Sequence, residues 1–170
     1  MSLRILALVT AIGAEVENTT TEGNLASHTF AADSLQAGKV YLITGSAVVV
    51  DNNSTDTLTL RLRFGSSTLP ASNTAVVTTA AIDSADADVA TFICFMTVRS
   101  VGTAGVVAFH GSICQPDAEG VGTTPMFGFN QVQTAVDTTS PLYFQYSAAW
   151  SVAHADNEVA ADSFIVCEVT

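Results

Sequence analysis

Three aspartates close together in one stretch of the chain are of a residue type that could bind a metal ion. Asp83, Asp86 and Asp88 lie in the sequence Asp-Ser-Ala-Asp-Ala-Asp, and carboxylate oxygens are the ligands that Ca²⁺ prefers. The stretch lacks the glycine and the distant glutamate of an EF-hand loop. We therefore interpret it as a solvated acidic loop, with a cation site as the alternative.

The three histidines are the candidates for a base that works near neutral pH. His154 alternates with Asp156 and Glu158 in a tight loop, and these three are an alternative set of metal ligands. His28 and His110 have no partner at a recognisable spacing, and we interpret them as ordinary strand residues. Nucleophilic catalysis also needs a nucleophile beside an oriented base, and the chain has neither a Gly-x-Ser-x-Gly nor a Gly-x-x-x-x-Gly-Lys motif. We expect no catalytic residues, no metal and no cofactor, so the chain is predicted not to be an enzyme. A hydrolase would need a histidine, a nucleophile and an acid to converge in space.

The three cysteines are far apart and lie within stretches that we expect to be strands. Cys94, Cys114 and Cys167 are odd in number and form no Cys-x-x-Cys pair. A disulfide framework favours an even count, and a zinc site favours closely spaced pairs. We interpret all three as buried thiols that act as small apolar residues.

The charge and the length of the apolar stretches argue against a nucleic acid and a membrane as partners. The 170 residues carry a net charge of −11, and the cations are one lysine, Lys39, and four arginines. Binding to a nucleic acid requires lysines and arginines that neutralise phosphates, so we expect no nucleic-acid partner. No stretch approaches the roughly 20 apolar residues of a membrane span, so we expect no membrane partner either.

The elements that must position these residues are β-strands, because apolar and polar residues alternate along much of the chain. In residues 57–64, Leu58, Leu60, Leu62 and Phe64 share one face, and a period of two is typical of a half-buried strand. Eight or nine such strands at short spacing predict an all-β sandwich or barrel. The clearest strands are 40–50, 57–64, 91–99, 106–114, 142–150 and 164–169, and weaker ones are 27–32, 75–82 and 127–133.

Three of the five cations lie on the polar faces of two predicted strands. Arg61 and Arg63 lie on one strand and Arg99 on another. One interpretation is cross-strand pairing with Asp or Thr, which stabilises a sheet by a few tenths of a kcal/mol per pair. The other is an interface, where arginine is enriched.

The aromatic residues near the end of the chain have two interpretations. Tyr143, Phe144, Tyr146 and Trp150 form one cluster in the sequence. Exposed aromatic rings would suit a sugar-binding surface. However, Phe144, Tyr146 and Trp150 share one face of their strand, which is more simply explained by the core and its rim.

Several segments, taken in order, resemble a group of tailed-bacteriophage virion proteins, which are small jelly-roll proteins that decorate or cement the outside of the head. The most specific feature is the order Thr-Leu-Thr-Leu-Arg-Leu, then Val-Arg-Ser-Val-Gly-x-x-Gly, then a strand that ends at Trp150. The segments 83–88 and 115–124 have no counterpart in this resemblance. The matching segments are 35–47, 54–65, 95–107, 144–150 and 162–169.

The resemblance implies a jelly-roll β-sandwich of about eight antiparallel strands and no enzymatic activity. It also implies a homotrimer that binds the major capsid protein on the outer surface of the virion. The open edges of a sandwich are consistent with oligomerisation, because unpaired strand edges invite pairing. The alternative function is a carbohydrate- or receptor-binding module of a phage head or tail fibre.

The first residues are predicted to form an arm, with residues 1–24 as arm and connection and 25–170 as the sandwich domain. Leu3, Ile5, Leu6 and Leu8 make the arm apolar on both faces, which is typical of a strand covered on both sides. Together with Arg61, Arg63 and Arg99, they are the candidate oligomer or capsid interface. We expect a neighbouring subunit or the capsid to cover the arm. The alternatives are an ordinary first strand in its own core and a cleaved secretory leader.

Overall fold

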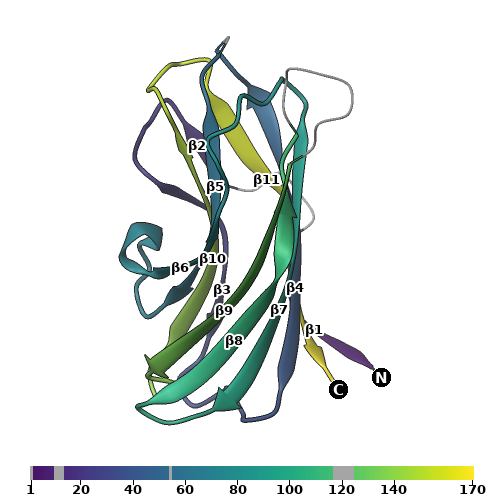
Figure 1. The fold of residues 1–170 in the computed structure, drawn as a ribbon, viewed down its shortest axis with the longest axis vertical. Helices are drawn as coiled ribbons and strands as arrows, with labels where there is room; N and C mark the ends of the chain where they lie inside the picture. Colours follow the sequence, from purple (N-terminus) through teal and green to yellow (C-terminus); the bar gives the residue numbers. More distant parts are fainter. Residues whose placement is uncertain (1, 10–13, 54, 117–124) are drawn as a thin grey trace.

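The computed structural model describes residues 2–9, 14–53, 55–116 and 125–170, and its regular structure is almost entirely β-strand (Figure 1). The all-β prediction is confirmed. One short 3₁₀ helix, η1 (Pro70–Ser72), interrupts the strands. The strands are β1 (Leu3–Val9), β2 (Glu15–Glu17), β3 (Gly23–Phe30), β4 (Val40–Asp51), β5 (Leu58–Gly65), β6 (Thr74–Thr78), β7 (Val89–Ser100), β8 (Gly105–Cys114), β9 (Met126–Val136), β10 (Leu142–Trp150) and β11 (Glu158–Val169).

The strands form two antiparallel sheets that pack face to face, so the chain is a β-sandwich (Figure 1). The large sheet has the order β1-β11-β4-β7-β8-β9, with β2 pairing β11 beyond the end of β1. The small sheet has the order β3-β10-β5-β6. One open side of the sandwich therefore lies between the edge strands β9 and β6, and the other between β1, β2 and β3.

All nine strands expected from the alternation form, but the stretch 15–24 differs from its expected role as a connection. Glu15–Glu17 is β2, which pairs with β11, and β3 begins at Gly23. Val16 is buried in the core, and its carbonyl oxygen accepts a hydrogen bond of 3.1 Å from Nε1 of Trp150. The strands of residues 1–24 thus lie within the sandwich.

The inner faces of the two sheets enclose the core as the alternation predicts. Leu58, Leu60, Leu62 and Phe64 of β5 are fully buried, because the pleat directs alternate side chains toward the large sheet. The neighbouring strand β10 buries Phe144, Tyr146 and Trp150 in the same layer. The core interpretation of this aromatic cluster is confirmed.

The strand β1 is held in its own large sheet and is covered on one face only. It pairs with β11, and its register shifts between Ile5 and Ala7. Leu6, Ala7 and Val9 are partly buried against the core. On the other face, Leu3, Ile5 and Leu8 remain exposed. The alternative of an ordinary first strand thus describes the inner face, and cover of the outer face by a neighbour stays a prediction.

Candidate functional site

The outer face of the large sheet is apolar, although an outward-facing sheet surface is ordinarily polar. The strand registers arrange its side chains in three rows, each of which crosses β1, β11, β4, β7, β8 and β9. None of the side chains in these rows is Asp, Glu, Lys or Arg. We call this surface the outer apolar face. Its rows are Leu3, Val169, Val40, Thr97, Ala108 and Val132; Ile5, Cys167, Leu42, Phe95, His110 and Asn130; and Leu8, Ile165, Thr44, Ile93, Ser112 and Gly128.

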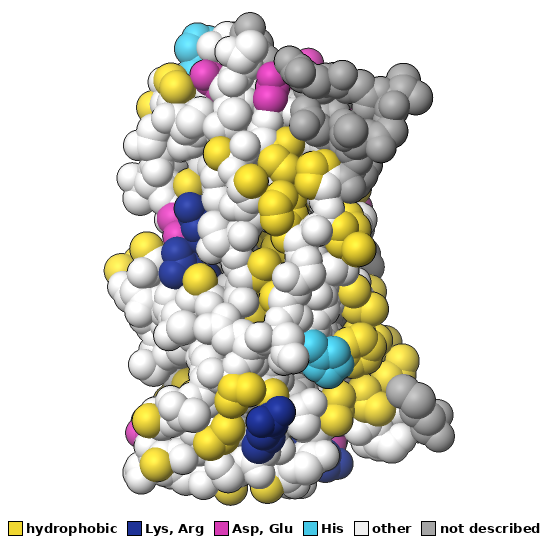
Figure 2. Space-filling model, viewed as in Figure 1, with side chains coloured by type: hydrophobic (Ala, Val, Ile, Leu, Met, Phe, Trp, Pro, Cys, Tyr) yellow, Lys and Arg dark blue, Asp and Glu magenta, His cyan; other side chains and the backbone are white. Residues whose placement is uncertain are grey.

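The exposed hydrophobic side chains of the described residues concentrate on the large sheet. Eight of the eleven large hydrophobic side chains that are exposed lie on its strands, whereas none lies on a strand of the small sheet. Ile5 is 60% exposed and Ile93 43%. Figure 2 shows hydrophobic side chains in a band down the right side of the view, which ends near the N-terminal strand. Contiguous apolar patches of this kind mark interaction sites.

The middle row of the outer apolar face contains a stacked pair of rings. Phe95 and His110 lie opposite each other on β7 and β8, with ring centroids 5.1 Å apart and planes at 13°. The charged side chains of these strands lie outside the three rows. Arg99 is exposed near the end of β7, and Asp162 on β11 accepts a 2.8 Å hydrogen bond from Ser46. A neighbouring molecule could therefore cover the rows without burying an unpaired charge.

The outer face of the small sheet has the opposite character, because an ion-pair cluster covers it. Arg63 donates from Nε to Oε1 of Glu22 at 2.9 Å and from a terminal nitrogen to Oε2 at 2.6 Å. Arg61 lies 3.8 Å from the same carboxylate, and Ser147 donates a 2.6 Å hydrogen bond to it. Glu22 is the shared centre of this cluster and is mostly buried.

The carboxyl group of Glu22 is ionised in this setting. Burial alone would raise its pKa, but hydrogen bonds from Arg63 and Ser147 and the positive charges of Arg63 and Arg61 outweigh burial and hold the pKa below its ordinary value of 4.5. A folded-state pKa that is lower than the unfolded one contributes stability above the unfolded pKa. That contribution is lost as the pH falls through the folded pKa.

Glu22→Gln is expected to lower the free energy of unfolding by about 1–3 kcal/mol at pH 7, because two arginines lose their carboxylate. The difference from the wild type should shrink as the pH falls below 4.5, because the wild-type carboxyl is protonated first in the unfolded chain and, at lower pH, in the folded chain as well. Urea unfolding at pH 7 and at pH 3 measures both values. Glu17→Gln, at an exposed position, is the matched control. An equal loss at both pH values would contradict the role of the charge.

The structure does not bring the three predicted arginines together. Arg61 and Arg63 lie on the small sheet and bind Glu22, which precedes β3 and is not a residue of the strands that pair with β5. Arg99 lies on the large sheet, is exposed, and forms no ion pair with any residue that the structure describes. Of the three, Arg99 is therefore the one whose charge is available to an interface.

The acidic loop is held by hydrogen bonds within the chain. The side-chain amide of Asn52 donates to Asp83 at 3.1 Å, and its backbone N–H donates to Asp86 at 2.9 Å. Asp88 accepts from the backbone of Ala85 at 2.8 Å. Within residues 2–9, 14–53, 55–116 and 125–170, no group of three histidine, cysteine or acidic side chains could hold a metal ion.

The remaining candidates for chemistry are not assembled into a site. All three cysteines are free, and burial raises the pKa of the Cys94 thiol, which disfavours a reactive thiolate. Nδ1 of His154 accepts a hydrogen bond from the backbone of Asp156 at 3.2 Å.

Of the segment 115–124, only the first two residues are described. Gln115 is buried and donates to the carbonyl oxygen of Leu58 at 3.0 Å.

Comparisons with known proteins do not identify a function for the chain. No protein-family model, curated protein or solved structure matches the chain. In the part of the chain that the structure describes, no helix has the length and hydrophobicity needed to cross a bilayer.

Sequence reasoning missed the outer apolar face, although its signal is present. Residues 40–43 read Val-Tyr-Leu-Ile and residues 164–167 read Phe-Ile-Val-Cys, without a polar residue in either run. A run that is apolar at both parities is typical of a strand covered on both faces. In the single chain only one face of these strands is covered.

Proposed function

We propose that this chain is a non-enzymatic structural protein of a bacteriophage virion, which decorates and stabilises the outer surface of the capsid as a homotrimer. The observation that carries the proposal is the outer apolar face, which has no Asp, Glu, Lys or Arg in its three rows although the net charge is −11. Copies with the same large charge repel one another elsewhere on their surfaces. Contact through this face buries apolar area and brings no charges together.

The order of the strands supports the jelly-roll form of the sandwich. The connections β3–β4, β4–β5, β6–β7, β9–β10 and β10–β11 each pass from one sheet to the other. Such crossings are expected where Greek keys build two sheets, and the β8–β9 hairpin would then extend the large sheet. The resemblance to head-decoration proteins supplies the location and the number three. The alternative remains a carbohydrate- or receptor-binding module of a head or tail fibre.

The purified chain is expected to bind empty heads of the phage whose genome encodes it, and to raise the temperature at which those heads disrupt. Cosedimentation and thermal scanning of the heads measure both effects, and heads mixed with albumin are the control. Tight binding to a defined sugar on a glycan array, with no affinity for heads, would favour the fibre module instead.

A further inference from the structure

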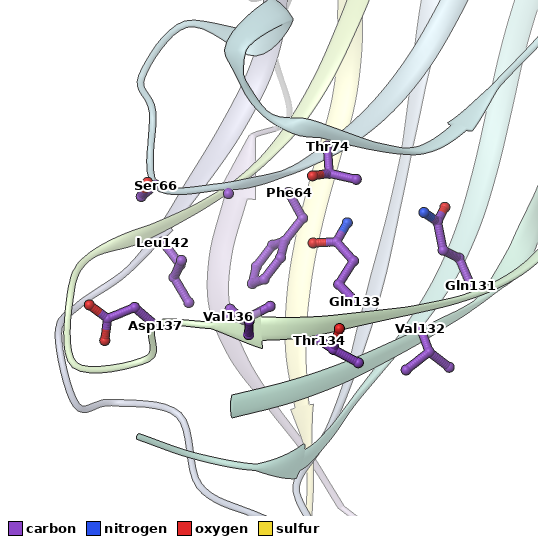
Figure 3. A pocket seen from close by; sticks show the side chains of 12 residues that line it. Phe64, Ser66, Thr74, Gln131, Val132, Gln133, Thr134, Val136, Asp137 and Leu142 are labelled. Carbon is purple, nitrogen blue, oxygen red and sulfur yellow. The ribbon is translucent and has the colours of Figure 1, made fainter. Parts of the chain in front are cut away.

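The open side between β9 and β6 contains a cleft of about 430 Å³. Its floor includes the fully buried Phe64 of β5 and Val136 near the end of β9. Figure 3 shows Gln131 and Gln133 extending from β9 toward Thr74 of β6. A pocket of 300–1,000 Å³ with an apolar floor and a few polar groups is typical of a binding site.

The glutamines occupy positions on β9 that would ordinarily face the core. Phe127 and Phe129 precede them on the same inner face and pack partly against the core. Nε2 of Gln133 is buried and has no hydrogen-bond partner among the residues that the structure describes. A buried donor without an acceptor costs about 1–3 kcal/mol. Rotation of the half-buried Gln133 side chain toward the cleft would therefore be favoured by an occupant that brings an acceptor.

The adjoining edge of β9 offers a row of main-chain groups. The backbone N–H of Gln115 donates to the carbonyl oxygen of Pro125 at 3.2 Å, and antiparallel pairing alternates between bonded and unbonded residues. Residues 127, 129, 131 and 133 therefore bond β8. The main-chain groups of residues 126, 128, 130 and 132 point away from it.

The edge of β9 has one feature that usually prevents strand addition, a bulge at residues 134 and 135, and this bulge lies beyond the ladder of residues 126–132. The strand has eleven residues and contains no charged residue and no proline. Edge strands are ordinarily blunted by lysine, by proline or by short length, and an open edge binds extended peptides through main-chain hydrogen bonds. The ladder and the cleft lie on the same strand, so one extended segment can contact both.

We propose that the cleft between β9 and β6 binds an extended segment of the capsid protein, which adds a strand to β9 and offers a carbonyl oxygen to Gln133. This inference rests on the proposed function. Within the described residues, the strands of a second copy are already fixed in a sheet, and a sheet is too wide to enter a cleft between two sheets. The capsid segment is expected to be uncharged where it enters the cleft, because the lining offers few charged groups that could pair with it. Asp137 is the one acidic or basic residue in the lining.

The test replaces one outward-pointing main-chain donor. Asn130→Pro removes the N–H that faces the open edge and leaves the bonds to β8, whereas Asn130→Ala removes the same side chain and keeps the N–H. Asn130→Pro is expected to weaken binding to empty heads at least tenfold, and Asn130→Ala is expected to bind as the wild type does. Gln133→Leu is expected to weaken binding severalfold without lowering the melting temperature of the free chain.

Each outcome of this experiment is decisive. Wild-type protein that does not bind heads would overturn the proposed function and this inference together. Folded Asn130→Pro that binds heads like the wild type would overturn the inference alone. If the proline variant does not fold, the leucine variant decides in the same way. Glycan binding that is lost in Gln133→Leu and kept in Asn130→Pro would show that the cleft binds a small molecule. That result would overturn the proposed addition of a strand to β9.

Discussion

Gly111→Ala is expected to unfold most of the protein at 25 °C or to lower its free energy of unfolding by about 3 kcal/mol or more. Gly111 lies on β8 opposite Cys94 of β7. A Cβ atom there would lie 2.0 Å from the carbonyl oxygen of Ile93 and 3.0 Å from Cα of Cys94. These are backbone atoms of a central strand and cannot rotate aside, so the two strands must separate. Overpacking of a core commonly costs 1–3 kcal/mol and occasionally more.

The matched control for Gly111→Ala is Gly128→Ala on the neighbouring strand. Gly128 lies on β9, and a Cβ atom there would meet nothing within 4 Å. This change is expected to alter the free energy of unfolding by at most about 0.5 kcal/mol, or to raise it by restricting the unfolded chain. Urea denaturation of both variants at one protein concentration measures the difference. Equal midpoints for the two variants would contradict the close approach of β7 and β8.

The strands could be predicted from the sequence because alternation is a local signal. In β5, leucine at every second position identifies both the strand and the face that it buries, and the structure buries those side chains completely. The short strand β2 could not be predicted in this way. Its three residues, Glu15–Glu17, contain one apolar side chain, and β11 and Trp150 hold the strand in place. These partners lie more than 130 residues further along the chain.

The sequence indicated which residues could form an interface more clearly on β1 than elsewhere. The apolar pattern predicts that Leu3, Ile5 and Leu8 need cover, and the structure leaves them exposed in the single chain. Arg61 and Arg63 could not be separated from Arg99 by sequence alone. Their roles depend on Glu22, which precedes β3 and reaches them only when β3 and β5 pair with β10 on either side.

The outer apolar face and the cleft depend on the register across several strands. Ile93 and Val132 are hydrophobic side chains in separate strands, and neither is unusual in its own segment. Pairing of β7 with β8 and of β8 with β9 places them on one surface. A sequence pattern gives the parity of each strand, but it does not give the pairing that combines these parities into a face.

Ile93→Asp is expected to convert the proposed oligomer to monomers and to raise the dissociation constant of assembly at least 100-fold, which corresponds to about 2.7 kcal/mol. Ile93 lies on β7 between Thr44 and Ser112 in the outer apolar face and is 43% exposed. The folded single chain tolerates a carboxylate at this half-exposed position. An assembled interface would bury it beside like-charged copies, which costs several kcal/mol. Light scattering over a range of protein concentrations measures the change.

Two further variants separate the effect of the face from the effect of net charge. Thr29→Asp adds the same charge at an exposed position on β3, in the small sheet, and is expected to leave assembly unchanged. Ile93→Lys lowers the net negative charge, so it would strengthen assembly if general repulsion between acidic copies were the limiting term. Burial of a charge in an apolar contact predicts the opposite, namely dissociation by lysine as well as by aspartate. Dissociation by Ile93→Asp and Thr29→Asp but not by Ile93→Lys would therefore show that the contact between copies is not the outer apolar face. A wild-type protein that is monomeric at micromolar concentration would contradict the proposed oligomer.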